Sequence, residues 1–95
     1  ETLRNYGAVS EEVVCEMVEG ALSLSNSQLG VAISGIAGPG GGTKERPVGT
    51  VCIAWLREGE EVHSTTELFS GNRNEVRYAT VECALINAIR LVKEN

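Results

Sequence analysis

The stretch "LGVAISGIAGPGGGTKERPVGTVCIAWL", from Leu29 to Leu56, decides the fold because two apolar runs flank a glycine-rich loop. Residues 29–34 are short, contain β-branched side chains and are followed by glycine, which predicts a buried strand. Residues 49–56 are apolar without clean alternation, as is typical of a central strand covered on both faces. The loop leaves the C-terminal end of the first strand, which is where open α/β sheets usually bind ligands.

The loop itself, residues 34–50, holds six glycines and two prolines, with Lys44 and Arg46 inside it. Glycine tolerates positive φ and lets the backbone approach a ligand closely. We expect main-chain amides between Ile36 and Thr43 to converge on a phosphate or carboxylate. The glycines predicted to line this anion site are Gly35, Gly38, Gly40, Gly41 and Gly42. A solvated surface loop carrying two cations is the alternative that composition leaves open.

Two further cations stand near the start of a predicted helix. Arg73 and Arg77 lie one turn apart, and each guanidinium presents a fixed fork of donors that suits an anion. The alternative is that both are surface residues at a helix end with no binding role. The loop matches neither a Walker A sequence nor G-x-G-x-x-G, so neither an ATPase nor a Rossmann dinucleotide fold is predicted.

Helices are expected on both sides of these strands in the sequence. Ser10 precedes "EEVVCEMVEGALSLS" and can cap a helix by accepting a hydrogen bond from a first-turn amide. A third strand is predicted within residues 61–69, near a sheet edge, and a last helix from Arg73 to Lys93. We therefore predict an α/β fold with a mixed sheet in a layered α/β/α arrangement, comprising about three strands and two helices. The last helix is apolar around most of its circumference, which indicates a second packing partner.

Composition narrows the classes of function. The 95 residues fit one domain, and 42% hydrophobic with 22% charged residues is ordinary for a globular protein. A net charge of -5 argues against nucleic-acid or anionic-membrane partners. No apolar run reaches the ~18 residues of a membrane span and no secretory signal is present, so the cytoplasm is the expected location. The cysteines are interpreted as core thiols: Cys15, Cys52 and Cys83.

Catalytic triads and metal centres are not predicted. The chain contains no aspartate and His63 is its only histidine, so a Ser-His-Asp triad cannot be assembled from it, and a zinc site is not expected. Neither a metal nor a cofactor is expected.

Three segments together carry a family resemblance: "YGAVSEEV" (residues 6–13), "ISGIAGPGGGTKERPVGTV" (residues 33–51) and "FSGNRNEVR" (residues 69–77). Their order and spacing resemble the C-terminal domain family of the competence/damage-inducible protein CinA, over nearly all 95 residues. The resemblance implies hydrolysis of nicotinamide mononucleotide to nicotinate mononucleotide and ammonia, in pyridine nucleotide recycling. It implies no cofactor.

The resemblance also implies roles for single residues. Ser34 stands where the family usually has threonine, and Arg73 occupies the family's G-x-R motif, so both are expected to be catalytic, the arginine by holding the phosphate or polarising the amide. Arg77 and the loop glycines are expected to bind substrate. The family's nucleophilic serine, in an "ESCTGG"-like segment, and its lysine base precede the matched part. We therefore expect residues 1–95 to be the C-terminal portion of a longer domain of ~150 residues.

The expected partners are the mononucleotide substrate, the N-terminal half of the same domain, and further copies in a homo-oligomer. On this interpretation the chain alone is inactive. Two other functions stay open: a non-catalytic nucleotide-binding or regulatory module that kept the glycine loop, and an assembly domain whose last helix forms an oligomeric contact.

Overall fold

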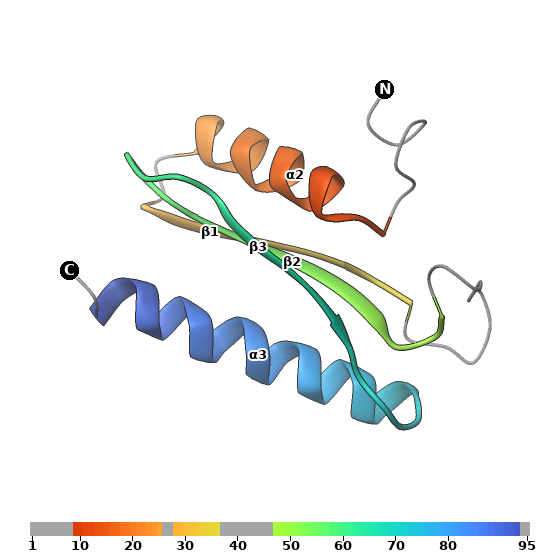
Figure 1. Cartoon of the computed structure of the whole chain (residues 1–95). Helices are drawn as coiled ribbons and strands as arrows, with labels where there is room; N and C mark the ends of the chain where they lie inside the picture. Colours follow the sequence, from red (N-terminus) through yellow and green to blue (C-terminus); the bar gives the residue numbers. More distant parts are fainter. Residues whose placement is uncertain (1–8, 26–27, 37–46, 94–95) are drawn as a thin grey trace.

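The computed structural model describes residues 9–25, 28–36 and 47–93, which form two helices and one sheet. In chain order the elements are α2 (Glu11–Ser23), β1 (Leu29–Gly35), β2 (Thr50–Arg57), β3 (His63–Leu68) and α3 (Arg73–Lys93). The sheet has the order β1-β2-β3. The helices α2 and α3 lie on opposite faces of it (Figure 1), so the described part has the predicted layered α/β/α arrangement.

The sheet differs from the prediction in its strand directions. The expectation of a mixed sheet is wrong for the described strands, because both pairs are antiparallel: Ala54 of β2 lies opposite Ala32 of β1 on one side and Ser64 of β3 on the other. Parallel neighbours need a long crossover, usually helical, whereas β2 and β3 are joined by only a short turn. Among the described strands, β3 lies at an edge of the sheet, as predicted.

The core is divided by β2, which is covered on both faces as predicted. Cys52 and Ala54 pack on the α2 side, whereas Val51, Ile53 and Trp55 pack on the α3 side. Successive side chains of a strand point to opposite faces, so an unbroken apolar run fills two layers at once. Cys52 is a buried core thiol as expected, whereas Cys15 and Cys83 are only partly buried.

Local hydrogen bonds fix the N-terminal ends of both helices. The Val13 amide donates to the Ser10 hydroxyl at 3.2 Å, which confirms the predicted cap of α2. At α3 the Glu75 amide donates to Asn72 Oδ1 at 2.9 Å, and the Asn72 amide donates to Glu75 Oε1 at 2.8 Å. This reciprocal capping box satisfies first-turn amides that have no partner within the helix.

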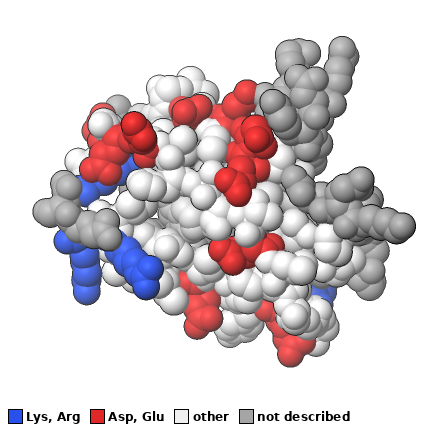
Figure 2. Space-filling view, viewed as in Figure 1, with Lys and Arg blue, Asp and Glu red and all other residues white. Residues whose placement is uncertain are grey.

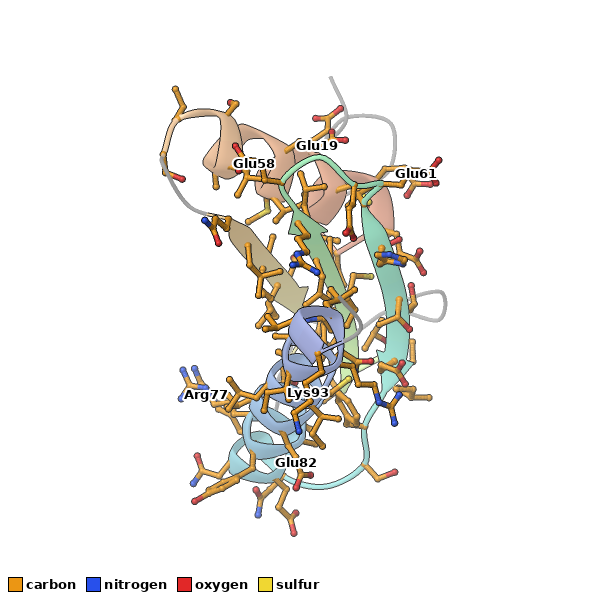
Figure 3. The ribbon with its side chains drawn as sticks, turned by 90° about the vertical axis from the view of Figure 1, so that its left-hand side faces the viewer. Glu19, Glu58, Glu61, Arg77, Glu82 and Lys93 are labelled. Atoms are coloured by element: carbon orange, nitrogen blue, oxygen red, sulfur yellow. The ribbon has the colours of Figure 1, made fainter. Side chains whose placement is uncertain are left out.

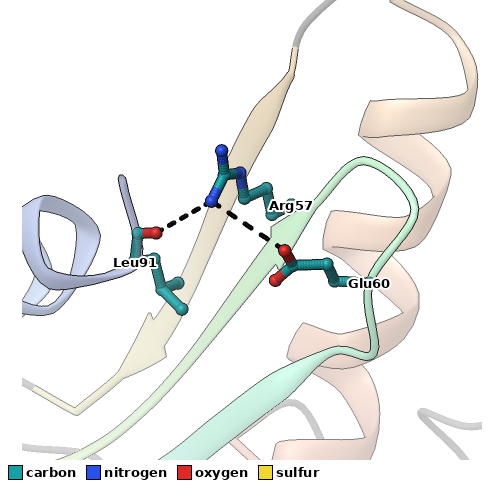
Figure 4. A network of polar contacts seen from close by, with 3 residues as sticks. All are labelled: Arg57, Glu60 and Leu91. Atoms are coloured by element: carbon teal, nitrogen blue, oxygen red, sulfur yellow. Dashed lines mark hydrogen bonds and ion pairs between the residues drawn. The ribbon is translucent and has the colours of Figure 1, made fainter. Parts of the chain in front are cut away.

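Polar contacts tie the helices to the sheet at specific points. The hydroxyls of Ser64 and Thr66 on β3 donate to the Glu11 carboxylate of α2 at 2.7 and 2.6 Å. On the other face, Arg57 at the end of β2 donates to the Leu91 carbonyl at 3.0 Å and lies 3.8 Å from Glu60 (Figure 4). The last carbonyls of a helix have no partner within it, so the arginine stabilises the C-terminal end of α3.

Gly49, which ends the glycine loop, is expected to tolerate no side chain. It has φ +98°, and a Cβ would overlap the Phe69 carbonyl oxygen. We predict that Gly49→Ala lowers the free energy of unfolding by about 2–3 kcal/mol, measured by urea denaturation. Gly59→Ala is the control, because Gly59 also has positive φ but nothing lies within 4 Å of its Cβ position. Equal losses for the two variants would contradict the proposed overlap with Phe69.

Candidate functional site

A pocket of about 240 Å³ opens on the α3 face of the sheet, at the end of β1 from which the glycine loop departs. Its walls come from β1, from the start of β2 and from the first turns of α3, and they are apolar apart from Thr80 and one cation. The lining residues are Ile33, Gly35, Val51, Val76, Arg77, Thr80 and Val81. Small-molecule pockets usually measure ~300–1,000 Å³, so this one is small for a complete site.

Two of the predicted site residues meet in this pocket. Gly35 and Arg77 are 42 positions apart in the sequence, and both line it. A Cβ on Gly35 would stand 3.0 Å from Val51 Cγ2 and 3.2 Å from the Thr50 carbonyl oxygen, so a larger residue would crowd this wall. Figure 3 shows Arg77 projecting from α3 on the side where β1 lies. Arg77 is the one charged residue among those that line the pocket.

Arg73 lies one turn before Arg77, at the first residue of α3, and its side chain is exposed. It is not among the residues that line the pocket. The capping box of Asn72 and Glu75 holds this turn in place, so the backbone that carries Arg73 is fixed while its side chain extends into solvent. The prediction that Arg73 acts on a substrate stays a prediction.

Ser34 lies on the other face of the sheet. It is paired with Cys52, whose side chain packs on the α2 side, and side chains of directly paired residues share one face. The structure therefore does not bring the Ser34 side chain into the pocket with Gly35 and Arg77. Its predicted catalytic role is untested by this geometry.

The described ends of the glycine loop are joined to each other by backbone hydrogen bonds that continue the pairing of β1 and β2. The Ile36 amide donates to the Thr50 carbonyl at 2.9 Å, and the Gly49 amide donates to the Ile36 carbonyl at 2.6 Å. The expectation that the Ile36 amide belongs to an anion nest is therefore wrong, because that amide extends the ladder between β1 and β2. Most of the predicted nest lies outside the described residues: Gly38, Gly40, Gly41 and Gly42, with Lys44 and Arg46.

A second, more polar pocket of about 370 Å³ lies between α3 and β3. Its walls include His63, Glu67 and Arg90, a juxtaposition that sequence spacing did not predict because it joins a strand and a distant part of a helix. Burial raises the pKa of the nearby Cys83 thiol, and the Glu67 carboxylate raises it further. The raised pKa disfavours the thiolate, which agrees with the interpretation of Cys83 as a structural residue.

The charge distribution shows no broad basic surface on the side seen in Figure 2. Carboxylates are spread over that face, and Lys and Arg gather where α3 ends. Within the described ranges, no group of three His, Cys, Asp or Glu residues could hold a metal ion, and no helix is long and apolar enough to cross a membrane.

Taken together, the fold and the pocket define a layered α/β/α protein with a small, largely apolar site at the end of an edge strand. The chain belongs to the CinA C-terminal domain family, whose model matches residues 1–92. The resemblance found in the three sequence segments is thereby confirmed.

Relatives of known name and structure agree with this membership. The chain is 49% identical over 85 residues to nicotinamide-nucleotide amidohydrolase PncC of Escherichia coli K12, which covers 90% of this chain and 52% of that enzyme. It is 50% identical over 95 residues to a CinA-like protein of Thermotoga neapolitana, covering 22% of it. The crystal structure of competence/damage inducible protein CihA from Agrobacterium tumefaciens superposes with a TM-score of 0.92 at 42% identity, over 96% of this chain and 56% of that one.

The lengths of these relatives bear on the site. The chain spans about half of the amidohydrolase and of the solved protein, and about a fifth of the CinA-like protein. About half of each shorter relative therefore has no counterpart among these 95 residues. The small volume of the pocket agrees with this partial coverage of the relatives.

Proposed function

We propose that this chain supplies the glycine-loop and arginine half of the active site of an amidohydrolase that converts nicotinamide mononucleotide to nicotinate mononucleotide and ammonia. The observation that carries the proposal is the 49% identity, over 85 residues, to an Escherichia coli enzyme named for that activity. The partner in this proposal is the N-terminal half of the same domain, which carries the serine nucleophile and its lysine base.

The chemistry of the reaction fits the residues at the pocket. Amide hydrolysis places negative charge on the carbonyl oxygen in the transition state, and positioned donors stabilise that charge. The substrate also carries a phosphate, for which a guanidinium is a strong and geometrically selective partner. Arg77 at the pocket and Arg73 one turn before it offer two such groups on successive turns of one helix, and the apolar walls can pack against the faces of the nicotinamide ring.

A chimera tests this proposal directly. In it, this chain replaces the matched portion of the Escherichia coli enzyme, and ammonia release from nicotinamide mononucleotide is measured. We expect kcat/KM within about tenfold of the parent enzyme. This corresponds to a loss of at most ~1.4 kcal/mol of transition-state stabilisation.

The control is the parent enzyme with its matched portion deleted, which should release no ammonia. A chimera that folds, as judged by circular dichroism, but releases none would contradict the proposal. If that chimera still bound the mononucleotide in calorimetry, the non-catalytic binding module would be the better description.

A further inference from the structure

The polar pocket of about 370 Å³ between α3 and β3 is separate from the pocket beside Arg77, and no residue lines both. Its volume lies within the ~300–1,000 Å³ that is usual for small-molecule sites. Trp55 is buried and Leu91 is half-buried, so apolar side chains form the floor of this pocket. Polar side chains from β3 and α3 surround that floor, and they differ in kind from one end to the other.

Hydrogen-bond acceptors gather at one end of the polar pocket. Asn87 Nδ2 donates to the Cys83 carbonyl at 2.8 Å, so Oδ1 is the end of the amide that is left to accept from a ligand. Burial and then the nearby Glu67 carboxylate raise the pKa of the Cys83 thiol, so Glu67 lies at the same end. The Thr65 hydroxyl donates to Glu67 Oε2 at 2.7 Å and orients the carboxylate. This end suits an ammonium group.

Hydrogen-bond donors lie at the other end, where β2 and α3 end. His63 is paired with Trp55, two residues before Arg57. Arg57 in turn donates to the carbonyl of Leu91, the neighbour of Arg90. Neither the His63 nor the Arg90 side chain forms a hydrogen bond or an ion pair with any residue in the described part of the chain. The Arg90 guanidinium is therefore available for a carboxylate, with which it forms strong, charge-assisted hydrogen bonds.

The separation of the two ends sets the length of a ligand that can reach both. His63 and Glu67 are four residues apart on one strand, which puts their Cα atoms about 13 Å apart. Asn87 and Arg90 are three residues apart on one helix, a rise of about 4.5 Å along its axis. The two ends of an extended dipeptide are about 7 Å apart, between these values. Free glycine carries both charges on one carbon and is too short.

We propose that this pocket binds a short linear zwitterion, of the class formed by dipeptides and ω-amino acids. Its carboxylate binds Arg90 and His63, its ammonium binds Glu67 and Asn87, and its main chain lies over the apolar floor. Glu67 and Arg90 line one pocket without forming an ion pair with each other, so a ligand of a single charge would satisfy only one of them. The proposal does not depend on the amidohydrolase activity, and either can fail alone.

Calorimetric titration with glycylglycine tests the proposal, on the 95-residue chain and on the chimera. We expect saturable one-to-one binding. Acetylation of the amino end removes the ammonium, and amidation of the carboxyl end removes the carboxylate. Each capped dipeptide should bind about tenfold more weakly or worse, because a charge-assisted contact is lost. 5-Aminopentanoate has both charges without a peptide bond, so the tighter of the two zwitterions identifies the source of the ligand.

Matched variants locate the bound zwitterion. Arg90→Gln and Glu67→Gln should each lower the affinity for glycylglycine about tenfold or more. Arg73→Gln and Glu82→Gln remove the same charges from parts of α3 that do not line this pocket, so they should leave the affinity unchanged. Circular dichroism checks that each variant is folded.

Several results would overturn the proposal. One is the failure of both zwitterions to bind either protein. Another is a capped dipeptide or free glycine that binds as tightly as glycylglycine. A third is unchanged affinity in folded Arg90→Gln and Glu67→Gln variants. A loss of affinity in Arg73→Gln alone would place the dipeptide elsewhere on α3 and would equally count against this pocket.

Discussion

Arg73→Ala in the chimera is expected to lower kcat/KM for nicotinamide mononucleotide about a hundredfold or more, which is the usual cost of losing one preorganised donor at a developing charge. Arg73 is the first residue of α3, on a turn whose backbone is fixed by the Asn72 and Glu75 capping box. The capping box fixes the backbone from which this guanidinium extends, without needing the loop to order it. Steady-state ammonia release measures the effect.

The kinetic parameter that changes distinguishes two roles for Arg73. If the guanidinium holds the phosphate equally in ground and transition states, KM rises and kcat is preserved. If it polarises the amide only as charge develops, kcat falls. Nicotinamide riboside, which lacks the phosphate, separates these cases independently, because its turnover should be insensitive to a residue that binds only the phosphate.

Arg77→Ala is the informative comparison, since Arg77 lines the pocket whereas Arg73 does not. A loss for Arg77→Ala that exceeds the loss for Arg73→Ala would move the main anion contact one turn along the helix. Full turnover by the Arg73→Ala variant would remove that residue from the site. Arg90→Ala, near the far end of α3, is the matched control and should have little effect.

A loss of activity in Arg73→Ala would not come from unfolding. The Arg73 side chain is exposed, and a cation at a helix N-terminus opposes the helix dipole, so its removal does not weaken α3. Circular dichroism and the urea midpoint should therefore match those of the unaltered chimera.

Local sequence signals predicted the secondary structure well. The bounds of α3 are the predicted Arg73 and Lys93, and Ser10 caps α2 as expected. Helix capping and apolar periodicity each depend on residues that are close together in the sequence, so both can be predicted from it. Strand direction depends on which segments meet in space, and that information is missing from apolar runs such as residues 29–34 and 49–56.

The candidate site was predictable only in part, for the same reason. Gly35 and Arg77 were singled out separately by backbone freedom and by donor geometry, and the fold then placed both in one pocket. The walls formed by Val76, Thr80 and Val81 had no signal of their own, because an apolar residue in a helix usually packs in the core and a single threonine forms no functional pattern. Ser34 lies on the opposite face of the sheet because of the register between β1 and β2, and the spacing of residues in the sequence does not give that register.

Trp55→Ala is expected to lower the free energy of unfolding of the 95-residue chain by about 3–5 kcal/mol, the usual range for truncating a buried aromatic residue. Trp55 is 4% exposed and belongs to the α3-facing cluster, and its indole N–H donates to the Ala84 carbonyl at 3.1 Å. It therefore joins β2 to the middle of α3 by both packing and a hydrogen bond. Urea unfolding followed by circular dichroism measures the loss without relying on the indole signal.

The size of this effect follows from how α3 is attached to the sheet. Among the described strands, only β2 presents a buried apolar row to α3, since Val31 and Ile33 of β1 are each 41% exposed and β3 is polar on that face. Losing the largest side chain of that row removes the main contact of the helix that carries Arg73 and Arg77. Trp55→Phe keeps most of the apolar area and should lose only about 1–2 kcal/mol, mainly the hydrogen bond. A loss below about 1 kcal/mol for Trp55→Ala would mean that α3 is held by contacts other than this row.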